Sequence, residues 1–264
     1  MVCQVLKNLQ SCNLQPCNLA TLQPCNPATL QPATLLPCNL ATLIKETPMP
    51  ASSPSAQWLL FFRQFIRDFA HMGAVLPSSR YLGQAAAAYL ARKTGPARVL
   101  EVGAGTGAFT RQIVPLLSPG DRLEVVEINP QLMAYLQQRF RQDPCFDAPG
   151  VEVRFINDDV RRVPVGEGYD FIIFSLPLTN FPPALVQEIL DLMIQQLKPG
   201  GVFSYVKYIF VGRLKYLFGS AGVKADMRAS QQIINRFAAQ YQIERRVVWR
   251  NLPPAWTFYW QKKE

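Results

Sequence analysis

The sequence has few of the residues that zinc sites need, and it lacks the long apolar run that a membrane-spanning helix needs. It contains one histidine, His71, and only one cysteine, Cys145, beyond its first 38 residues. A zinc site of the CxxC type is therefore not indicated, so we expect no metal and assign His71 no catalytic role. The longest charge-free apolar stretch, Phe171 to Val186, is interrupted by prolines and falls short of the roughly 20 apolar residues of a membrane-spanning helix. An integral membrane protein is thereby excluded.

The chain does have enough apolar material for a sizeable globular core. Of its 264 residues, 49% are hydrophobic and 17% are charged, which excludes a wholly disordered protein. We predict three parts: a low-complexity segment at 1–48, N-terminal amphipathic helices at 49–95, and a ligand-binding domain at 96–264.

Residues 1–48 differ in composition from the rest. Five of the six cysteines lie there, and three of them, Cys17, Cys25 and Cys38, belong to an eight-residue tandem repeat whose units begin at Pro16, Pro24 and Pro37. The repeat contains no histidine and no CxxC spacing, and each unit is too short to stack as a solenoid. We interpret it as a disordered tail or a translated repetitive element, with Met49 as the natural start; a signal peptide is disfavoured because no continuous apolar run follows a basic start. The remaining single cysteine is typical of a reduced, cytoplasmic protein.

The net charge of +9 is unevenly distributed. Residues 96–197 hold thirteen acidic and eight basic side chains, whereas 198–264 hold three acidic and twelve basic ones. This pattern predicts an acidic cleft beside a surface that meets an anionic partner, either lipid head groups or nucleic acid. A basic surface that is simply solvated is the alternative.

A strand, a glycine-rich turn and a helix follow one another from residue 98. Arg98–Val102 reads as a strand, residues 103–107 as the turn and 108–117 as a helix. In a doubly wound sheet such a turn binds ligands beyond the carboxyl end of the strand, and glycine lets the backbone approach them closely. A second strand, 123–126, ends in Glu127, where a carboxylate can accept hydrogen bonds from two ribose hydroxyls.

The alternation of strands and helices continues to the end of the chain. The predicted strands are 151–156, 169–174 and 202–206, the predicted helices are 185–197 and 229–240, and 247–260 is predicted as a closing hairpin. Asp158 and Asp159 follow the third strand. Instead of binding a ligand, Glu127 or Asp159 could each be a solvated loop residue or a helix cap.

In their order and spacing, the segments EVGAGTG, VVEINP, NDDV, YDFIIFSLP and LKPGG resemble class I S-adenosylmethionine-dependent methyltransferases, over about residues 97–207. The resemblance implies a Rossmann-like α/β fold, with a doubly wound, seven-stranded, mostly parallel sheet and a C-terminal antiparallel hairpin. It implies S-adenosyl-L-methionine as the cofactor. The cofactor-binding residues that it assigns are Glu101, Gly103, Gly105 and Gly107 for the methionine portion, Glu127 for the ribose, Asp159 for the adenine amino group, and Ile128 and Asp158 beside them.

Two segments outside these landmarks combine aromatic and basic residues. On a helix, Gln57–Met72 places aromatic side chains on one face and Arg63 and Arg67 on the other, which suits a helix lying in a bilayer interface or one packed on the core. Tyr205–Phe218 mixes aromatic, aliphatic and basic residues near the expected mouth of the cleft. It either faces a membrane or packs internally.

The domain is also similar to the ribosomal RNA adenine dimethylases, but Ser175 and Leu178 stand where those enzymes carry a polar amide and a stacking aromatic residue. A closer resemblance, over residues 58–260, is to the bacterial phospholipid and ornithine-lipid N-methyltransferases. It is carried by FFRQFIRDFAHMGAVLPSSRYL, EVGAGTGAFT, SLPL and NLPPA. It implies methylation of an amine lipid head group, phosphatidylethanolamine to phosphatidylcholine or an ornithine lipid. It further implies a monomer in the cytoplasm, associated peripherally with the anionic inner face of the membrane, with no nucleic-acid partner.

Methyl transfer to an amine needs alignment of the reactants and the loss of one proton, not a covalent catalyst. We take Ser175, Leu176, Pro177 and Tyr208 as the catalytic-site candidates, with Tyr81 as a further proton acceptor. Two alternatives stay open: an RNA adenine N6-methyltransferase, and a catalytically inactive peripheral membrane protein with an empty cofactor site.

Overall fold

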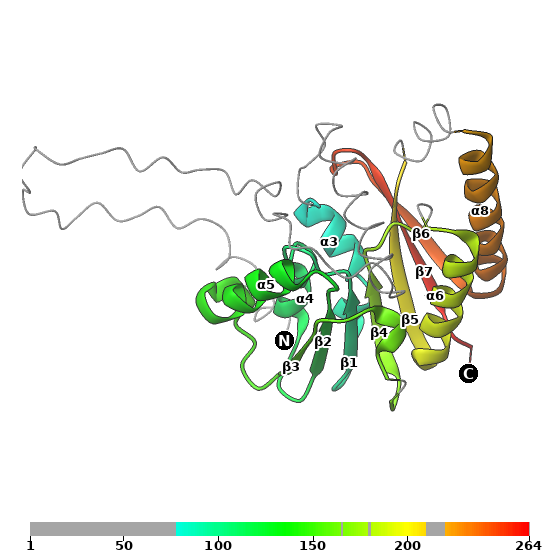
Figure 1. The fold of residues 1–264 in the computed structure, drawn as a ribbon. Helices are drawn as coiled ribbons and strands as arrows, with labels where there is room; N and C mark the ends of the chain where they lie inside the picture. Colours follow the sequence, from blue (N-terminus) through cyan, green and yellow to red (C-terminus); the bar gives the residue numbers. More distant parts are fainter. Residues whose placement is uncertain (1–77, 165, 179–180, 210–219, 264) are drawn as a thin grey trace, which may run out of the picture. The chain divides into compact units, whose positions relative to one another are not determined.

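The computed structural model describes residues 78–164, 166–178, 181–209 and 220–263, and these form a seven-stranded sheet with the order β3-β2-β1-β4-β5-β7-β6 (Figure 1). Strands β1 to β5 pair in parallel, and β7 runs antiparallel to both β5 and β6. The strands are β1 (Arg98–Val102), β2 (Arg122–Val126), β3 (Glu152–Ile156), β4 (Tyr169–Phe174), β5 (Leu197–Tyr208), β6 (Gln242–Val248) and β7 (Ala255–Gln261). The predicted fold class is confirmed. The predicted helix at 57–72, the repeat and residues 210–218 lie outside the described residues.

Helices cover both faces of this sheet. Ser204 and Tyr205 are neighbours on β5, so their side chains point to opposite faces. Ser204 Oγ donates to the carbonyl oxygen of Ala86 at 2.7 Å, whereas the Tyr205 ring packs against Trp260, which stacks on Phe237. Helix α3 therefore covers one face and α8 the other. The α-helices are α3 (Arg80–Ala86), α4 (Thr110–Ile113), α5 (Pro130–Gln142), α6 (Pro183–Gln196) and α8 (Ala221–Tyr241).

The register brings the ends of the central strands to one level. Val102 pairs with Val126 on one side and with Phe174 on the other, and Phe174 pairs with Tyr205. After β1 the chain builds outward through β2 and β3, and then returns to place β4 on the opposite side of β1. This reversal at β1 and β4 is where doubly wound sheets bind ligands, beyond the carboxyl ends of the strands.

Several element boundaries differ from the predicted ones. The helix predicted at 108–117 is the short α4 followed by a 3₁₀ turn, Val114–Leu116, because Pro115 has no amide to continue the α-helical bonding. Strand β5 begins at Leu197, directly after α6, rather than at Val202. Helix α8 begins at Ala221, where the Ser220 hydroxyl accepts from the amide of Val223, eight residues before the predicted start.

Candidate functional site

The glycine-rich turn after β1 has the backbone that its residues predicted. Gly103, Gly105 and Gly107 have φ angles of 76°, 57° and 82°, a left-handed region that L side chains rarely adopt. A Cβ on Gly103 would lie 2.4 Å from Leu176 Cδ2, and one on Gly107 would lie 2.6 Å from Leu136 Cδ1. A Cβ on Gly105 would meet nothing closer than a carbonyl oxygen at 4.0 Å. The outer two glycines therefore allow close packing, while Gly105 borders open space.

Glu127, at the end of β2, closes over this turn. Its side chain is 1% exposed, Oε2 accepts from the amide of Gly105 at 2.9 Å, and Oε1 accepts from the amide of Asn129 at 2.8 Å. Burial raises the pKa of this carboxyl, against the lowering effect of the backbone amides of Asn129, Gly105 and Ile128. Each carboxylate oxygen has a second lone pair. The two oxygens can therefore accept from two adjacent hydroxyl groups while they hold the turn.

Glu101 is the second buried carboxyl at the site. It lies on β1 and is fully buried, and neither Oε1 nor Oε2 has a hydrogen-bond partner among the described residues. Burial raises its pKa to about 8, offset in part by neighbouring Thr110 and reinforced by the charge of Glu127. A buried carboxyl without a partner is stabilised by a cation or a hydrogen-bond donor that reaches it.

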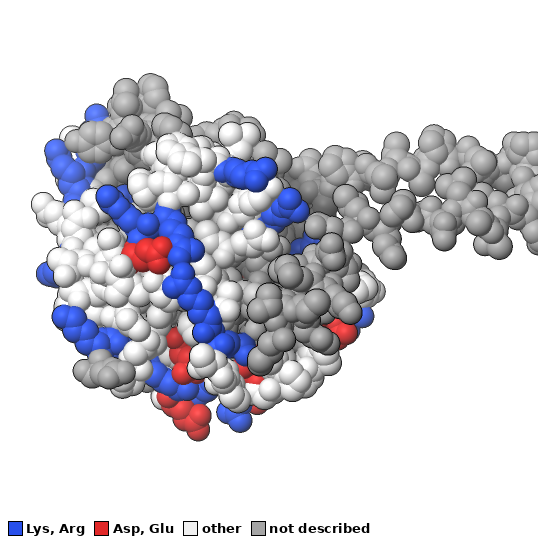
Figure 2. Space-filling model, turned by 180° about the vertical axis from the view of Figure 1, so that it is seen from behind, with Lys and Arg blue, Asp and Glu red and all other residues white. Residues whose placement is uncertain are grey.

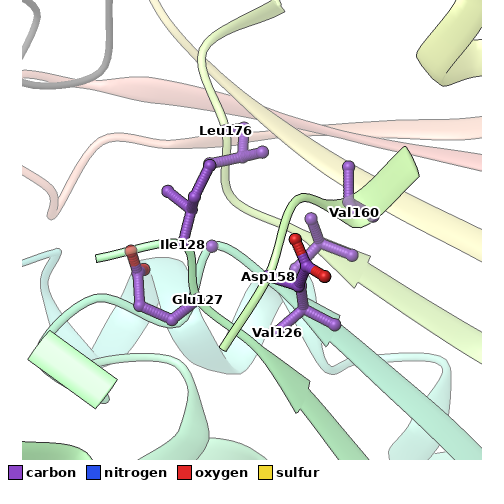
Figure 3. A pocket seen from close by; sticks show the side chains of 8 residues that line it. Val126, Glu127, Ile128, Asp158, Val160 and Leu176 are labelled. Carbon is purple, nitrogen blue, oxygen red and sulfur yellow. The ribbon is translucent and has the colours of Figure 1, made fainter. Parts of the chain in front are cut away.

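The strand ends surround a cavity of about 200 Å³. It lies at the ends of four strands, and Figure 3 shows Ile128 and Leu176 on one side with Asp158 and Val160 on the other. The lining residues are Val102, Gly103, Val126, Glu127, Ile128, Asp158, Val160 and Leu176. This volume includes space that is open to solvent, so the residues line a shallow pocket rather than an enclosed cavity.

The two predicted aspartates are placed differently. Asp158 lines the cavity. The Asp159 side chain is 1% exposed, and both of its oxygens accept from the Arg161 guanidinium, with Oδ2 2.6 Å from Nη2. Asp159 Oδ1 also accepts from the amide of Arg161 at 3.0 Å. Asp159 thus ties down the loop after β3. The Asp158 side chain is 42% exposed, and its Oδ1 accepts from the amide of Asp159 at 2.7 Å and lies 3.4 Å from Arg162 Nη1.

The catalytic-site candidates after β4 are only partly brought to the cavity. Leu176 lines it, whereas Ser175 and Pro177 are half-buried beside it. Ser175 Oγ lies 3.0 Å from the carbonyl oxygen of Val102 and 2.5 Å from that of Gly103, so its single proton is directed to the backbone of the glycine turn. Tyr208 lies at the end of β5, where its hydroxyl is 3.0 Å from Ser78 Oγ and burial raises its pKa.

Some lining residues were not predicted. Val102, Val126 and Val160 supply apolar walls at the ends of strands, and nothing in their sequence distinguishes them from core valines. Arg161 was also not predicted, although its position two residues after Asp159 is a usable signal. Within the described residues, no cluster of three or more histidine, cysteine, aspartate and glutamate side chains can hold a metal ion, and no helix is long and apolar enough to cross a membrane.

Comparison with known proteins agrees with this geometry. A methyltransferase-domain family model matches residues 99–201. The ornithine lipid N-methyltransferase of Singulisphaera acidiphila is 28% identical over 149 residues, covering 56% of this chain and 77% of that protein. The ubiquinone/menaquinone biosynthesis C-methyltransferase UbiE of Stutzerimonas stutzeri is 28% identical over 107 residues, 39% of each chain. The crystal structure of a putative rRNA methylase from Clostridium thermocellum has a similar fold, with a TM-score of 0.51 and 17% identity over 70% of this chain and 97% of that one.

The residues at the site fit S-adenosylmethionine. Gly105 leaves open space for a close ligand approach, Glu127 has lone pairs for a ribose diol, and Glu101 offers an unpartnered buried carboxyl to a cationic ligand. The chain is an S-adenosylmethionine-dependent methyltransferase.

Proposed function

We propose that the chain methylates the amine of a membrane-lipid head group, in an ornithine lipid or in phosphatidylethanolamine. The observation that carries the proposal is the match to an ornithine lipid N-methyltransferase over 77% of that protein's length. That match extends beyond the 103 residues covered by the general methyltransferase model. It agrees with the resemblance of residues 58–260 to lipid N-methyltransferases. We further propose a peripheral enzyme that works at an anionic membrane surface.

When bound, S-adenosylmethionine supplies a methyl group on a positively charged sulfur. Glu127 would hold the ribose hydroxyls with the lone pairs that Gly105 and Asn129 leave unused, and Asp158 would accept from the adenine amino group between Ile128 and Val160. Burial raises the pKa of Glu101 to about 8, and positive charge on the methionine portion would lower this pKa and hold Glu101 as the carboxylate. Together these carboxylates favour a cationic donor over a neutral product.

Ser175 would position the acceptor amine. Because its proton is directed to the carbonyl oxygens of Val102 and Gly103, its oxygen is left with lone pairs that point away from the backbone and can accept an N–H of the substrate. Leu176 closes the cavity beside it and limits the access of water. An apolar surrounding lowers the pKa of an ammonium and so favours the neutral amine that attacks the methyl group. Alignment of nitrogen, methyl and sulfur is the main catalytic contribution.

An RNA adenine methyltransferase is the competing function, because a basic surface also suits phosphate contacts. Figure 2 shows a face on which Lys and Arg are widespread and Asp and Glu are few. However, Leu178 is only 3% exposed, so the position at which the adenine dimethylases carry a stacking aromatic residue belongs to the core. This packing favours the lipid over a flipped base.

The test is incubation with methyl-labelled S-adenosylmethionine and vesicles that contain ornithine lipid or phosphatidylethanolamine, followed by chromatography of the lipids. The proposal predicts label in the amine head group of at least one of them, and none with phosphatidylglycerol alone. A parallel assay with ribosomal RNA should give no label. Label in RNA alone, or no transfer to either lipid by protein that binds S-adenosylhomocysteine, would overturn the proposal.

A further inference from the structure

The turn between β6 and β7, residues 249–254, projects beyond the edge of the sheet that carries the cofactor site. Tyr205 pairs with Phe174, the last residue of β4, and Tyr208 pairs with Ala255, the first residue of β7. The turn therefore starts three residues farther along than the end of β4, about 10 Å at the usual rise of a strand. Figure 1 shows this end of the hairpin near α3.

The β6–β7 turn is held in place by buried hydrogen bonds. Asn251 is 3% exposed; its Oδ1 accepts from the amide of Ser79 at 2.9 Å and its Nδ2 donates to the carbonyl of Pro253 at 2.7 Å. The amide of Ile209 donates to the carbonyl of Pro254 at 2.9 Å. The turn is thus fixed to the segment before α3 and to the end of β5, so its outward side chains are preorganised.

Those outward side chains are apolar. Trp249 is 70% exposed and Leu252 is 71% exposed, more than any other large hydrophobic residue in the described parts of the chain. A rigid turn with two apolar side chains in water gains by burying them, since neither packs against the core. Tryptophan in particular favours the interface between water and lipid, where its ring is buried and its N–H stays wet.

The charges around these two residues are positive. Arg250 lies between them in sequence, and its guanidinium is 4.5 Å from the centre of the Tyr81 ring. Arg80 lies 4.9 Å from the same ring and donates to the Tyr81 hydroxyl, which lowers the pKa of Tyr81. The sequence has no Asp or Glu in residues 78–89 or 247–255. Such a basic rim around apolar tips matches an anionic bilayer surface.

We propose that the β6–β7 turn docks the enzyme on anionic membranes, with Trp249 and Leu252 inserted at the head-group level and Arg80 and Arg250 on the phosphates. Because the turn stands on the same edge as the cofactor cavity, docking there turns the mouth of the site toward the lipid. The delivery of substrate rests on the proposed function, but the docking itself does not.

The experiment is co-sedimentation with vesicles made of equal parts of phosphatidylglycerol and phosphatidylcholine. Wild-type protein should bind, and the double variant Trp249→Ser, Leu252→Ser should partition roughly tenfold less or weaker still. The matched control is Ile243→Ser, which removes a side chain 46% exposed at the other end of β6 and should leave binding unchanged. Equal thermal midpoints and equal affinities for S-adenosylhomocysteine should show that all three proteins are folded.

Vesicle binding by the double variant within about twofold of wild type would overturn the inference, as would wild-type protein that stays in solution. So would sedimentation velocity showing a wild-type dimer that the double variant converts to monomer, because the apolar pair would then bind a second copy. If wild type methylates lipids but the turn is not needed for binding, only this inference fails. If binding needs the turn but no lipid accepts the label, only the proposed function fails.

Discussion

Replacing Gly105 by alanine should weaken cofactor binding while leaving the protein folded. At φ 57° an alanine costs about 1–2 kcal/mol of folding free energy, since its Cβ crowds the following carbonyl. No further cost arises, because the nearest atom to the new Cβ is 4.0 Å away. In a domain of this size that lowers the thermal midpoint by roughly 2–8 °C. The same methyl group occupies the open space that the ligand must approach, so we expect the affinity for S-adenosylhomocysteine to fall at least about tenfold.

Two further alanine variants make the result interpretable. Gly120 also has a left-handed backbone, at φ 92°, and a Cβ there lies 3.8 Å from Pro96, at the amino end of β2 and away from the site. Gly120→Ala should therefore share the fall in midpoint without the fall in affinity. Gly103→Ala should be the least stable of the three, since its Cβ overlaps Leu176. Differential scanning fluorimetry and titration calorimetry give both quantities. If Gly105→Ala binds as tightly as Gly120→Ala, the reasoning about the turn is refuted.

Four more variants test the carboxylates. Folded Glu101 keeps its proton up to a pKa of about 8, against 4.5 for a free glutamate, so the folded state binds more protons than the unfolded state. The free energy of unfolding therefore falls from pH 5 to 8, by at most about 5 kcal/mol. In Glu101→Gln that fall should vanish in urea unfolding at the two pH values; an unchanged fall would contradict the assigned burial. Glu127→Gln has one acceptor oxygen instead of two and should weaken S-adenosylhomocysteine binding by roughly 10- to 100-fold in calorimetry. An unaltered affinity would show that Glu127 does not bind the ribose. Asp158→Asn should lower the affinity for S-adenosylhomocysteine without changing the thermal midpoint, because Asp158 lines the pocket. Asp159→Asn should lower the thermal midpoint, because Asp159 holds Arg161. The reverse pattern would mean that the two aspartates have each other's role.

The central strands could be predicted from sequence because their residues are apolar on both faces. Strands β1 and β4 have the predicted bounds, because a short run of β-branched and aliphatic residues between turns predicts a buried strand of a parallel sheet. The start of α8 was missed because its first two turns, residues 221–228, carry few large apolar side chains: Val223 and Met227 have helical spacing but are only half-buried. The Ser220 cap is a second signal for this start.

The sequence predicts which loops meet at the pocket, since Gly103, Glu127, Ile128 and Asp158 all line it. Sequence alone does not distinguish the two adjacent aspartates. In the structure Arg161 pairs with the buried Asp159, and Arg162 pairs with the partly exposed Asp158. In the sequence, the β6–β7 turn is marked only by NLPPA, one of the segments that resemble the lipid N-methyltransferases. Which of its side chains are exposed depends on the burial of Asn251, which bonds to Ser79, 172 residues away in the chain.

The most direct test of the account is a crystal structure of the enzyme with S-adenosylhomocysteine. It should show both ribose hydroxyls within about 3 Å of the Glu127 carboxylate oxygens, and the adenine between Ile128 and Val160 with Asp158 at its amino group. A nucleoside bound elsewhere, or a Glu127 side chain that makes no contact with the ribose, would contradict it.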